Sequence, residues 1–344
     1  MHNKLTVIMS CYNQEGYIQQ AVESVLMQRT NFNFTIIIAD DHSTKDKSTE
    51  IIKEYVDRYP DKIKAILSES NSRYLANILR AKSLVKTDYF CLLDVDDYWT
   101  DAYKLQNAYD FLEKNPEYSI YSTNTLCLYE NGTQHPLISP TTPNSTYDIA
   151  DFLTGKAKAT QTSGTVFRNV IFKYGIPEII RNSIGTISER SFEGDLGRYA
   201  IHLKHGKALF VNTVDSVYRV LSNGIWNCMS AFEKHVLMAQ AFIDYSVYFE
   251  DQHKGGFYNR AWTYLRKAGD EMVESINTMQ PAGKSHDIYI IFFTLLEKYC
   301  SCHDFRHVPS ESTQKRAKRL KYRIIKKTYE YARGILKKKG LLNI

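Results

Sequence analysis

The first hundred residues alternate between short apolar runs and segments with helical periodicity. Apolar runs of strand length occupy residues 5–9, 34–39, 63–67 and 89–93. Amphipathic helical patterns separate them, most clearly over residues 16–28 and 74–85. A run that is apolar and β-branched on both faces is typical of a buried parallel strand. The alternation therefore predicts an α/β fold with a parallel sheet covered by helices on both sides.

Two of the predicted strands end in carboxylates. Asp40 and Asp41 follow the second strand, and Asp94, Asp96 and Asp97 follow the fourth. In a parallel sheet both groups lie at the same edge, where open α/β sheets bind ligands. Carboxylates this close repel one another, and Mg²⁺ often combines one or two of them with substrate phosphates. The pattern favours a metal site for a phosphorylated substrate, with a solvated helix-capping turn as the alternative.

Composition narrows the class of protein. The chain has 344 residues, enough for one large domain with an appendage or for two domains, and its net charge is +6. It contains neither a Gly-x-Gly-x-x-Gly nor a Gly-Lys-Ser/Thr phosphate loop, which disfavours dinucleotide and P-loop enzymes. Its six cysteines lack framework spacing, as expected in a reducing compartment. We see no signal peptide or run of transmembrane length, so we expect a cytoplasmic protein.

Three linked motifs resemble family 2 glycosyltransferases of GT-A fold, of the bacterial cell-surface polysaccharide type. They are VIMSCYN at 7–13, IIIADDHST at 36–44 and LDVDDYW at 93–99. The resemblance implies a Rossmann-like, mostly parallel sheet, a nucleotide-diphospho-sugar donor, a divalent Mn²⁺ or Mg²⁺ ion and inversion at the anomeric carbon. Relatives usually carry Asp-Asp-Gly-Ser after the second strand. His42 stands in place of that glycine, and His is among the residues that tolerate positive φ.

The resemblance also implies a set of donor and metal residues. The donor site it implies consists of Ser10, Tyr12, Asp40, Asp41, Asp94 and Arg219. Asp96 is the metal ligand, and Asp94 supports the metal. Asp40 either shares the donor role with Asp41 or is structural. Arg219 either contacts the diphosphate, for which a planar guanidinium is suited, or makes a structural salt bridge. A uridine nucleotide is the expected donor, with a carboxylate on the uracil N–H and Tyr12 stacked on the base.

The segment Glu-Gly-Asp-Leu at 193–196, followed by a helix, resembles the part of the family that carries the catalytic base. By that match Asp195 is the base. The acceptor hydroxyl loses a proton as it attacks the sugar, and a carboxylate within hydrogen-bond reach can accept it. Glu193 and Glu189 are the rival bases. The structural alternative for Asp195 is a carboxylate stabilised by the dipole at a helix N-terminus.

The domain boundaries follow from the change in pattern. Residues 1–225 are expected to form the catalytic domain, divided into a nucleotide-sugar and metal half (1–115) and an acceptor half (116–225). Helical periodicity dominates residues 226–344, which we expect to be a helical appendage that packs on the catalytic domain or supports a homo-oligomer. Cys300, Cys302, His303 and His307 suggest a zinc site only weakly, because a structural site normally uses four ligands at x₂ to x₄ spacing that close a defined loop.

Residues 315–339 are strongly basic, with Leu320 and Ile324 among the apolar residues between the charges. Such a helix can lie on an anionic membrane surface, which favours a peripheral position on the inner face of the cell membrane. A solvated charged helix is the alternative. Nucleic acid fits poorly, because the rest of the chain shows no basic reading surface.

Three functional hypotheses are consistent with the sequence. The leading hypothesis is a metal-dependent inverting hexosyltransferase that moves a sugar from a UDP-sugar to a hydroxyl of a glycan or lipid-linked acceptor. A nucleotidyltransferase that makes nucleotide sugars is the second, but its Gly-rich basic loop is missing at residues 10–15. A catalytically inactive sugar-nucleotide-binding scaffold is the third, and the intact carboxylates argue against it. The sequence names neither the sugar nor the acceptor.

Overall fold

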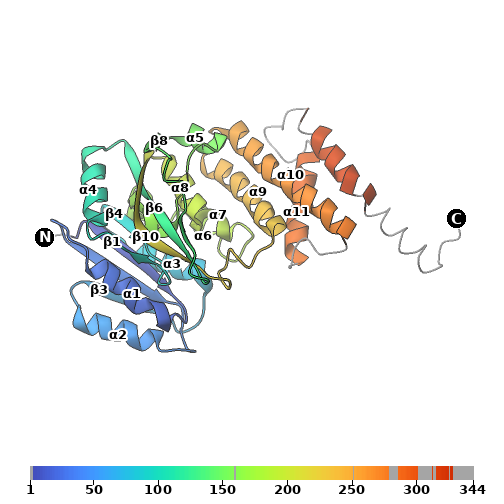
Figure 1. Ribbon diagram of the computed structural model, residues 1–344. Coiled ribbons are helices and arrows are strands. Elements are labelled where there is room, and N and C mark those ends of the chain that lie inside the picture. The colour runs from blue at the N-terminus through green and yellow to red at the C-terminus, as the bar shows by residue number, and fades with distance from the viewer. Residues whose placement is uncertain are drawn as a thin grey trace, which may run out of the picture. The chain divides into compact units, whose positions relative to one another are not determined.

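The structure is a computed structural model that describes residues 3–158, 160–250, 252–278, 286–300, 312, 315–324 and 326–327. The chain divides into two compact units, Met1–Leu221 and Ser222–Ile344. The first unit is a mixed α/β domain, and the second is helical where it is described (Figure 1).

Four parallel strands form the amino-terminal half of the sheet, in the order β3-β2-β1-β4 (Figure 1). Their bounds are Leu5–Cys11 for β1, Phe34–Asp40 for β2, Ile63–Leu67 for β3 and Tyr89–Leu92 for β4. The helices that connect them are α1 (Glu15–Leu26), α2 (Ser48–Arg58) and α3 (Arg73–Ser83). Every residue of β1 and β2 is buried, because strands and helices cover both faces. The predicted parallel α/β arrangement is confirmed.

The other half of the sheet is mixed. Strand β9 (Thr165–Arg168) lies antiparallel between β4 and β6 (Tyr118–Tyr129), and β6 pairs in parallel with β10 (Lys207–Val220). Strand β5 (Tyr98–Trp99) closes this edge against β10. Two short strands, β7 (Gln134–Pro136) and β8 (Ser145–Tyr147), pair with β6 and β10. Because β5 directly follows the acidic residues, its pairing with β10 fixes where the acidic loop ends.

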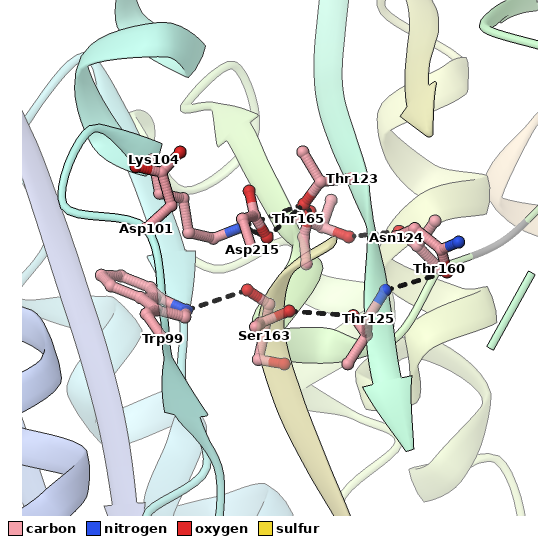
Figure 2. Close-up of polar contacts among 12 residues, drawn as sticks. Trp99, Asp101, Lys104, Thr123, Asn124, Thr125, Thr160, Ser163, Thr165 and Asp215 are labelled. Atoms are coloured by element: carbon pink, nitrogen blue, oxygen red, sulfur yellow. Dashed lines mark hydrogen bonds and ion pairs between the residues drawn. The ribbon is translucent and has the colours of Figure 1, made fainter. Parts of the chain in front are cut away.

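Helix α4 (Lys104–Lys114) was not predicted, although Leu105, Ala108 and Leu112 have helical spacing and are fully buried. Its first residue enters a buried polar cluster (Figure 2). The Lys104 ammonium lies 2.8 Å from an Asp215 carboxylate oxygen on β10 and 3.0 Å from the Thr123 hydroxyl on β6. Buried ion pairs of this kind are costly to break from one side, so the cluster ties α4 to two strands.

Four short helices complete the first unit: α5 (Ile149–Thr154), α6 (Glu178–Arg181), α7 (Glu189–Glu193) and α8 (Asp195–Leu203). The contact between α7 and α8 requires glycine at Gly197. A Cβ there would lie 2.1 Å from the Ser191 carbonyl oxygen, closer than any real contact. Gly197 therefore brings α8 against α7 and sets the position of Asp195 at the start of α8.

In the second unit, the predicted helices are present as α9 (Ala231–Tyr248), α10 (Lys254–Thr278) and α11 (His286–Cys300). A capping box between Ser230 and Glu233 starts α9. Residues 315–324 and 326–327 are also helical. The suggested zinc ligands from Cys302 to His307 and the end of the basic segment lie outside the described residues. Within the described part of the chain, we find no helix that is long and apolar enough to cross a bilayer.

Candidate active site

The acidic loop after β4 lies beside the end of β1. The Leu93 amide donates to the Ile8 carbonyl at 2.9 Å, which continues the strand pairing to the edge of the sheet. The next residue, Asp94, accepts a 3.1 Å hydrogen bond from the Ser10 hydroxyl. Ser10 and Asp94 were both predicted as site residues, 84 positions apart in the chain, and the parallel β1–β4 pairing brings them together.

Burial raises the pKa values of Asp94 and Asp96. For Asp94 the pKa rises to about 7, because the group is desolvated and the Asp96 charge is close, although Arg198 partly offsets both effects. The pKa of Asp96 is also raised by burial, while the nearby Arg219 lowers it. A hydrogen bond from its own backbone amide also lowers this pKa, and no side chain among the described residues donates to the Asp96 carboxylate. Two half-buried carboxylates that resist ionisation fit a divalent cation, which would stabilise their charged forms.

A cation at this loop would need ligands beyond the protein. Among the residues described, no group of three or more His, Cys, Asp or Glu side chains is arranged to hold a metal ion. Mg²⁺ and similar ions commonly take one or two carboxylates and complete their shell with water and substrate phosphates. The carboxylates of Asp94 and Asp96 therefore suit a cation that arrives with a diphosphate.

Asp97, the third carboxylate of the loop, is structural. It is buried, and its two oxygens accept hydrogen bonds from the Arg219 backbone amide at 2.9 Å and from the Gln161 side chain at 2.7 Å. Burial, followed by the neighbouring Asp96 and Asp94 charges, raises its pKa. The resemblance gave the metal to Asp96 and Asp94 and left Asp97 without a role. The structural role of Asp97 could not be predicted, because its donors come from two distant segments.

The Arg219 side chain is packed beside the same loop. Its guanidinium donates to the Asp96 carbonyl oxygen and lies over the rings of Tyr17 and Tyr98, 5.0 and 4.7 Å from their centroids. It also donates to Gln20 on α1. Arg219 forms no salt bridge with the described residues, so the structural alternative is not observed among them. Aromatic rings and neutral oxygens instead hold its positive charge beside Asp96.

The two carboxylates after β2 are both buried, but they accept different hydrogen bonds. Asp40 is buried and accepts hydrogen bonds from the Ser43 amide, the Ser43 hydroxyl and the Thr49 hydroxyl, at 3.0, 2.5 and 3.0 Å. Asp41 accepts two bonds from Ser72, at 2.9 and 2.7 Å, both at Oδ1. Its Oδ2 accepts no hydrogen bond from the described residues. Asp40 thus shapes the turn, whereas Asp41 retains an oxygen for a ligand.

The loops beside these carboxylates have the predicted backbone geometry. His42 has a φ of +67°, the left-handed conformation that the missing glycine would have adopted. Its ring contacts the Ser68 carbonyl oxygen at 3.2 Å. Asn13 also has positive φ, and its side chain accepts from the amides of Thr44 and Lys45. These bonds join the loops after β1 and β2 and leave the Tyr12 side chain 44% exposed beside them.

Asp195 is the first residue of α8, and 42% of its side chain is exposed. Its Oδ1 accepts from the Arg198 guanidinium at 2.7 Å and from the Thr162 hydroxyl. The negative charge of Asp195 is also one of the causes that raise the pKa of Asp94. Thr162, which donates to Asp195, directly follows Gln161, which donates to Asp97 of the acidic loop. The predicted base therefore lies near the predicted metal site, although about a hundred residues separate them in the chain.

The rival bases are engaged elsewhere. Glu193 is buried, and its carboxylate lies 2.7 Å from the Lys82 ammonium on α3. Burial lowers the pKa of Lys82 to about 8, although the Glu193 charge opposes the effect. Glu189 accepts from the Gly185 amide at 3.0 Å. Of the three acids, Asp195 combines an exposed carboxylate with a position near Asp94.

The family can now be identified. Residues 6–175 match the sequence model described as glycosyl transferase family 2. The chain belongs to glycosyltransferase family 2. The matched region contains the strands that carry Ser10, Asp41 and Asp96, but it ends before Asp195 and Arg219.

Several curated proteins are similar to this chain in sequence. Rv1520 of Mycobacterium tuberculosis, described as uncharacterized, is 29% identical over 223 residues, which are 65% of this chain. The chain spans 60% of that relative's length. The putative glycosyltransferase EpsE of Bacillus subtilis is 34% identical over 140 residues, 41% of this chain and 49% of EpsE. A teichoic acid poly(glycerol phosphate) polymerase of Staphylococcus epidermidis is 40% identical over 95 residues, 28% of this chain and 13% of that protein.

Solved structures share the fold. TarS 1-349 of S. aureus, crystallised with UDP-GlcNAc, matches with a TM-score of 0.58 over 99% of this chain and 93% of that chain, at 14% identity. The mannosyltransferase PcManGT of Pyrobaculum calidifontis, in complex with GDP-Man and Mn²⁺, matches with a TM-score of 0.51 over 94% of this chain and 86% of that chain, at 14% identity. At these identities the match supports the GT-A fold, and it does not transfer a substrate.

Proposed function

We propose that this family 2 glycosyltransferase is a metal-dependent, inverting hexosyltransferase. It would move a sugar from a UDP-sugar to a hydroxyl group of a glycan or lipid-linked acceptor. The observation that carries the proposal is that two consecutive residues, Gln161 and Thr162, donate hydrogen bonds to Asp97 of the acidic loop and to Asp195 on α8, which brings Asp195 near the loop that carries Asp94 and Asp96. A carboxylate that can accept a proton and a carboxylate that can support a cation then lie at one reaction centre.

The reaction is a single displacement. The acceptor oxygen forms a bond to the anomeric carbon, the bond from that carbon to the diphosphate oxygen breaks, and UDP leaves. Asp195 accepts the proton of the acceptor hydroxyl through its Oδ2, because Oδ1 is already occupied. Asp96, supported by Asp94 and Ser10, would hold Mn²⁺ or Mg²⁺, which when bound stabilises the negative charge of the leaving diphosphate. Arg219 adds a fixed positive charge beside the same loop.

The donor proposal concerns the loops after β1 and β2. The unoccupied Oδ2 of Asp41 can accept the uracil N–H, and the exposed Tyr12 ring can stack on the base. We assign Asp40 to the turn and not to the nucleotide, because both its oxygens are taken. The UDP and UDP-GlcNAc complexes of TarS, which has the same fold, support a uridine nucleotide.

The test begins with binding. A thermal-shift screen of nucleotide diphosphates, with and without Mn²⁺, should show the largest stabilisation by UDP in the presence of the metal, since ligands stabilise the state that they bind. Greater stabilisation by GDP or dTDP would overturn the uridine assignment. Transfer is then assayed from UDP-sugars to a panel that includes a poly(glycerol phosphate) oligomer and lipid-linked glycans, acceptor classes suggested by the teichoic acid polymerase among the relatives.

The base assignment is tested by Asp195→Asn. This variant should bind UDP and Mn²⁺ normally but lose roughly 10²–10⁴-fold in transfer rate, the usual range for a general base. Calorimetry and the transfer assay are carried out on the same protein sample. Normal transfer, or lost UDP binding with an intact fold, would return the base to Glu193 or Glu189.

We also propose that the basic segment holds the enzyme at an anionic membrane surface on the cytoplasmic side. Ala317, Leu320 and Ile324 are buried, and Leu320 packs against Gly269 of α10, so the apolar face is not available for insertion. Arg316, Lys318 and Arg319 are exposed on the remaining face. Binding would therefore be electrostatic, and salt would weaken it.

Vesicle sedimentation tests this surface. Reversing Arg316, Lys318 and Arg319 to Glu should abolish binding to phosphatidylglycerol vesicles at low salt and leave UDP binding unchanged. Reversal of Lys53, Lys86 and Lys114, three exposed lysines of the first unit, changes the net charge equally and serves as the control. Equal losses in both variants, or equal binding to neutral vesicles, would reject the assignment.

A further inference from the structure

The turn Thr162–Gly164, with Gln161 before it, contacts both parts of the proposed reaction centre. Gln161 donates to Asp97 in the acidic loop at 2.7 Å. The next residue, Thr162, donates its hydroxyl proton to Asp195 on α8. Consecutive residues thus bind a carboxylate of the metal loop and the proposed base, which lie 98 positions apart in the chain.

Contacts with Trp99 and with strand β6 fix the position of this turn. The Ser163 carbonyl accepts a 2.9 Å hydrogen bond from the Trp99 indole, which extends the buried polar cluster of Figure 2 to the turn. A Cβ on Gly164 would lie 2.8 Å from the Thr123 carbonyl oxygen, so the turn sits directly on β6. The Gln161 side chain also accepts the Ser163 amide at 2.6 Å. All four residues from Gln161 to Gly164 are buried, and their conformation is determined by these contacts.

At the base, the contacts form a closed triangle. The Arg198 guanidinium donates to the Thr162 hydroxyl oxygen at 2.6 Å and to Asp195 Oδ1 at 2.7 Å. The Thr162 hydroxyl in turn donates to the same Oδ1. Arg198 is itself buried and donates to the Glu193 carbonyl oxygen. Two donors therefore hold one oxygen of Asp195, and the other oxygen accepts no hydrogen bond from the described residues.

We infer that Gln161 and Thr162 are positioning residues that hold the acidic loop and the base Asp195 in fixed positions relative to one another. Thr162, together with Arg198, orients Asp195 so that Oδ2 faces the acceptor hydroxyl. Gln161 fixes Asp97, and through it the loop that carries Asp94 and Asp96. The inference rests on the proposed function and adds to it a division of roles between two adjacent residues: loss of Thr162 impairs transfer, and loss of Gln161 impairs donor binding.

The test compares matched variants. Thr162→Val removes the hydroxyl at nearly constant volume, and Thr162→Ser retains it. Thr160→Val is the control, because the buried Thr160 hydroxyl forms a 2.8 Å hydrogen bond with Thr165 and, within the described residues, makes none with either carboxylate. Thr162→Val should lower kcat for transfer about 10- to 100-fold, as expected for a misplaced catalytic group, with an unchanged Kd for UDP in Mn²⁺. Thr162→Ser should restore most of kcat.

Gln161→Leu should show the opposite pattern, with UDP binding in Mn²⁺ weakened about tenfold, the lower end of what loss of a supporting contact around a metal site causes. Calorimetry measures this Kd, and the melting temperature checks the fold. The inference is overturned if Thr162→Val behaves as Thr160→Val does, if serine fails to rescue, or if Gln161→Leu binds UDP as the wild type does.

Failure of the proposed function would look different. In that case the wild type itself would transfer no sugar from any donor in the panel. The positioning claim would then be decided by crystal structures of Thr162→Val and Thr162→Ser. The carboxylate of Asp195 should turn away from its present position in the valine variant and keep it in the serine variant. An unmoved carboxylate in Thr162→Val would reject the role of Thr162.

Discussion

The carboxylates after β2 and those after β4 occupy equivalent places at the edge of one sheet, yet they differ in the hydrogen bonds that they accept. In each region one acid serves the fold: Asp40 accepts three hydrogen bonds within its turn, and Asp97 accepts two from distant segments. The β4 region then places two more acids beside Asp97, and among the described residues Ser10 is the only one whose side chain donates to their carboxylates. Donors occupy both oxygens of Asp40 and Asp97, whereas in Asp41 and Asp94 they reach Oδ1 alone among the described residues. Whether both oxygens are occupied separates structural acids from acids that await a ligand.

The largest effect that would test this comparison is expected for Asp96→Asn. Because no side chain among the described residues donates to this carboxylate, the variant should fold normally and lose about 10³-fold in Mn²⁺-dependent turnover, equivalent to several kcal/mol of charge stabilisation. Initial rates over a range of Mn²⁺ concentrations, with a melting curve, measure both. Full turnover would remove Asp96 from the metal site.

Asp40→Asn should mainly lower the stability of the fold, whereas Asp96→Asn should mainly lower turnover. The amide group presents an NH₂ to donors that now bind two carboxylate oxygens, so a buried turn loses charge-assisted bonds. We expect a loss of about 3 kcal/mol in the free energy of unfolding. Urea denaturation measures it, with Asp41→Asn as the matched control, since Ser72 reaches only one of that residue's oxygens. Equal stability losses in the two variants would contradict the contrast between them.

The pH dependence of metal binding sharpens the comparison further. Burial and the Asp96 charge raise the pKa of Asp94 to about 7, so below that pH a proton competes with the cation. Mn²⁺ affinity should rise up to about tenfold per pH unit below pH 7 and level off above it. Calorimetry in buffers of different ionisation enthalpy would detect the released proton. A Mn²⁺ affinity that does not change between about pH 5.5 and about pH 8 would contradict the raised pKa of Asp94.

The smallest effect concerns the metal-free protein. A carboxyl whose pKa is higher in the folded than in the unfolded state favours folding least when it is ionised, that is, above pH 7 for Asp94. The pKa shift by itself corresponds to about 4 kcal/mol at alkaline pH. Asp94→Asn also loses the charge-assisted bond from Ser10, worth about 1.5–3 kcal/mol, so the net gain in metal-free stability should be on the order of 1 kcal/mol. The gain should shrink as the pH falls through the folded pKa and vanish below the unfolded one. Melting curves in EDTA test this, and a gain that is independent of pH would point to packing instead.

The sequence by itself determined the α/β class, the four parallel strands and their acidic ends. Apolar runs alternating with helical periodicity leave few other ways to bury those residues. It also predicted the positive φ of His42 and the helix that begins at Asp195. These features depend on local patterns or on motifs that lie within one segment.

Only the tertiary structure decided which carboxylates are structural. Asp97 looks identical to Asp96 in the sequence, but its donors lie 64 and 122 residues away, on Gln161 and Arg219. The same holds for Asp195 and Glu193, two residues apart, of which one is exposed and the other is paired with Lys82 from α3. A carboxylate's role depends on the hydrogen-bond donors and charges around it. Those arrive from distant segments, so their arrangement exists only once the sheet and its helices have packed together.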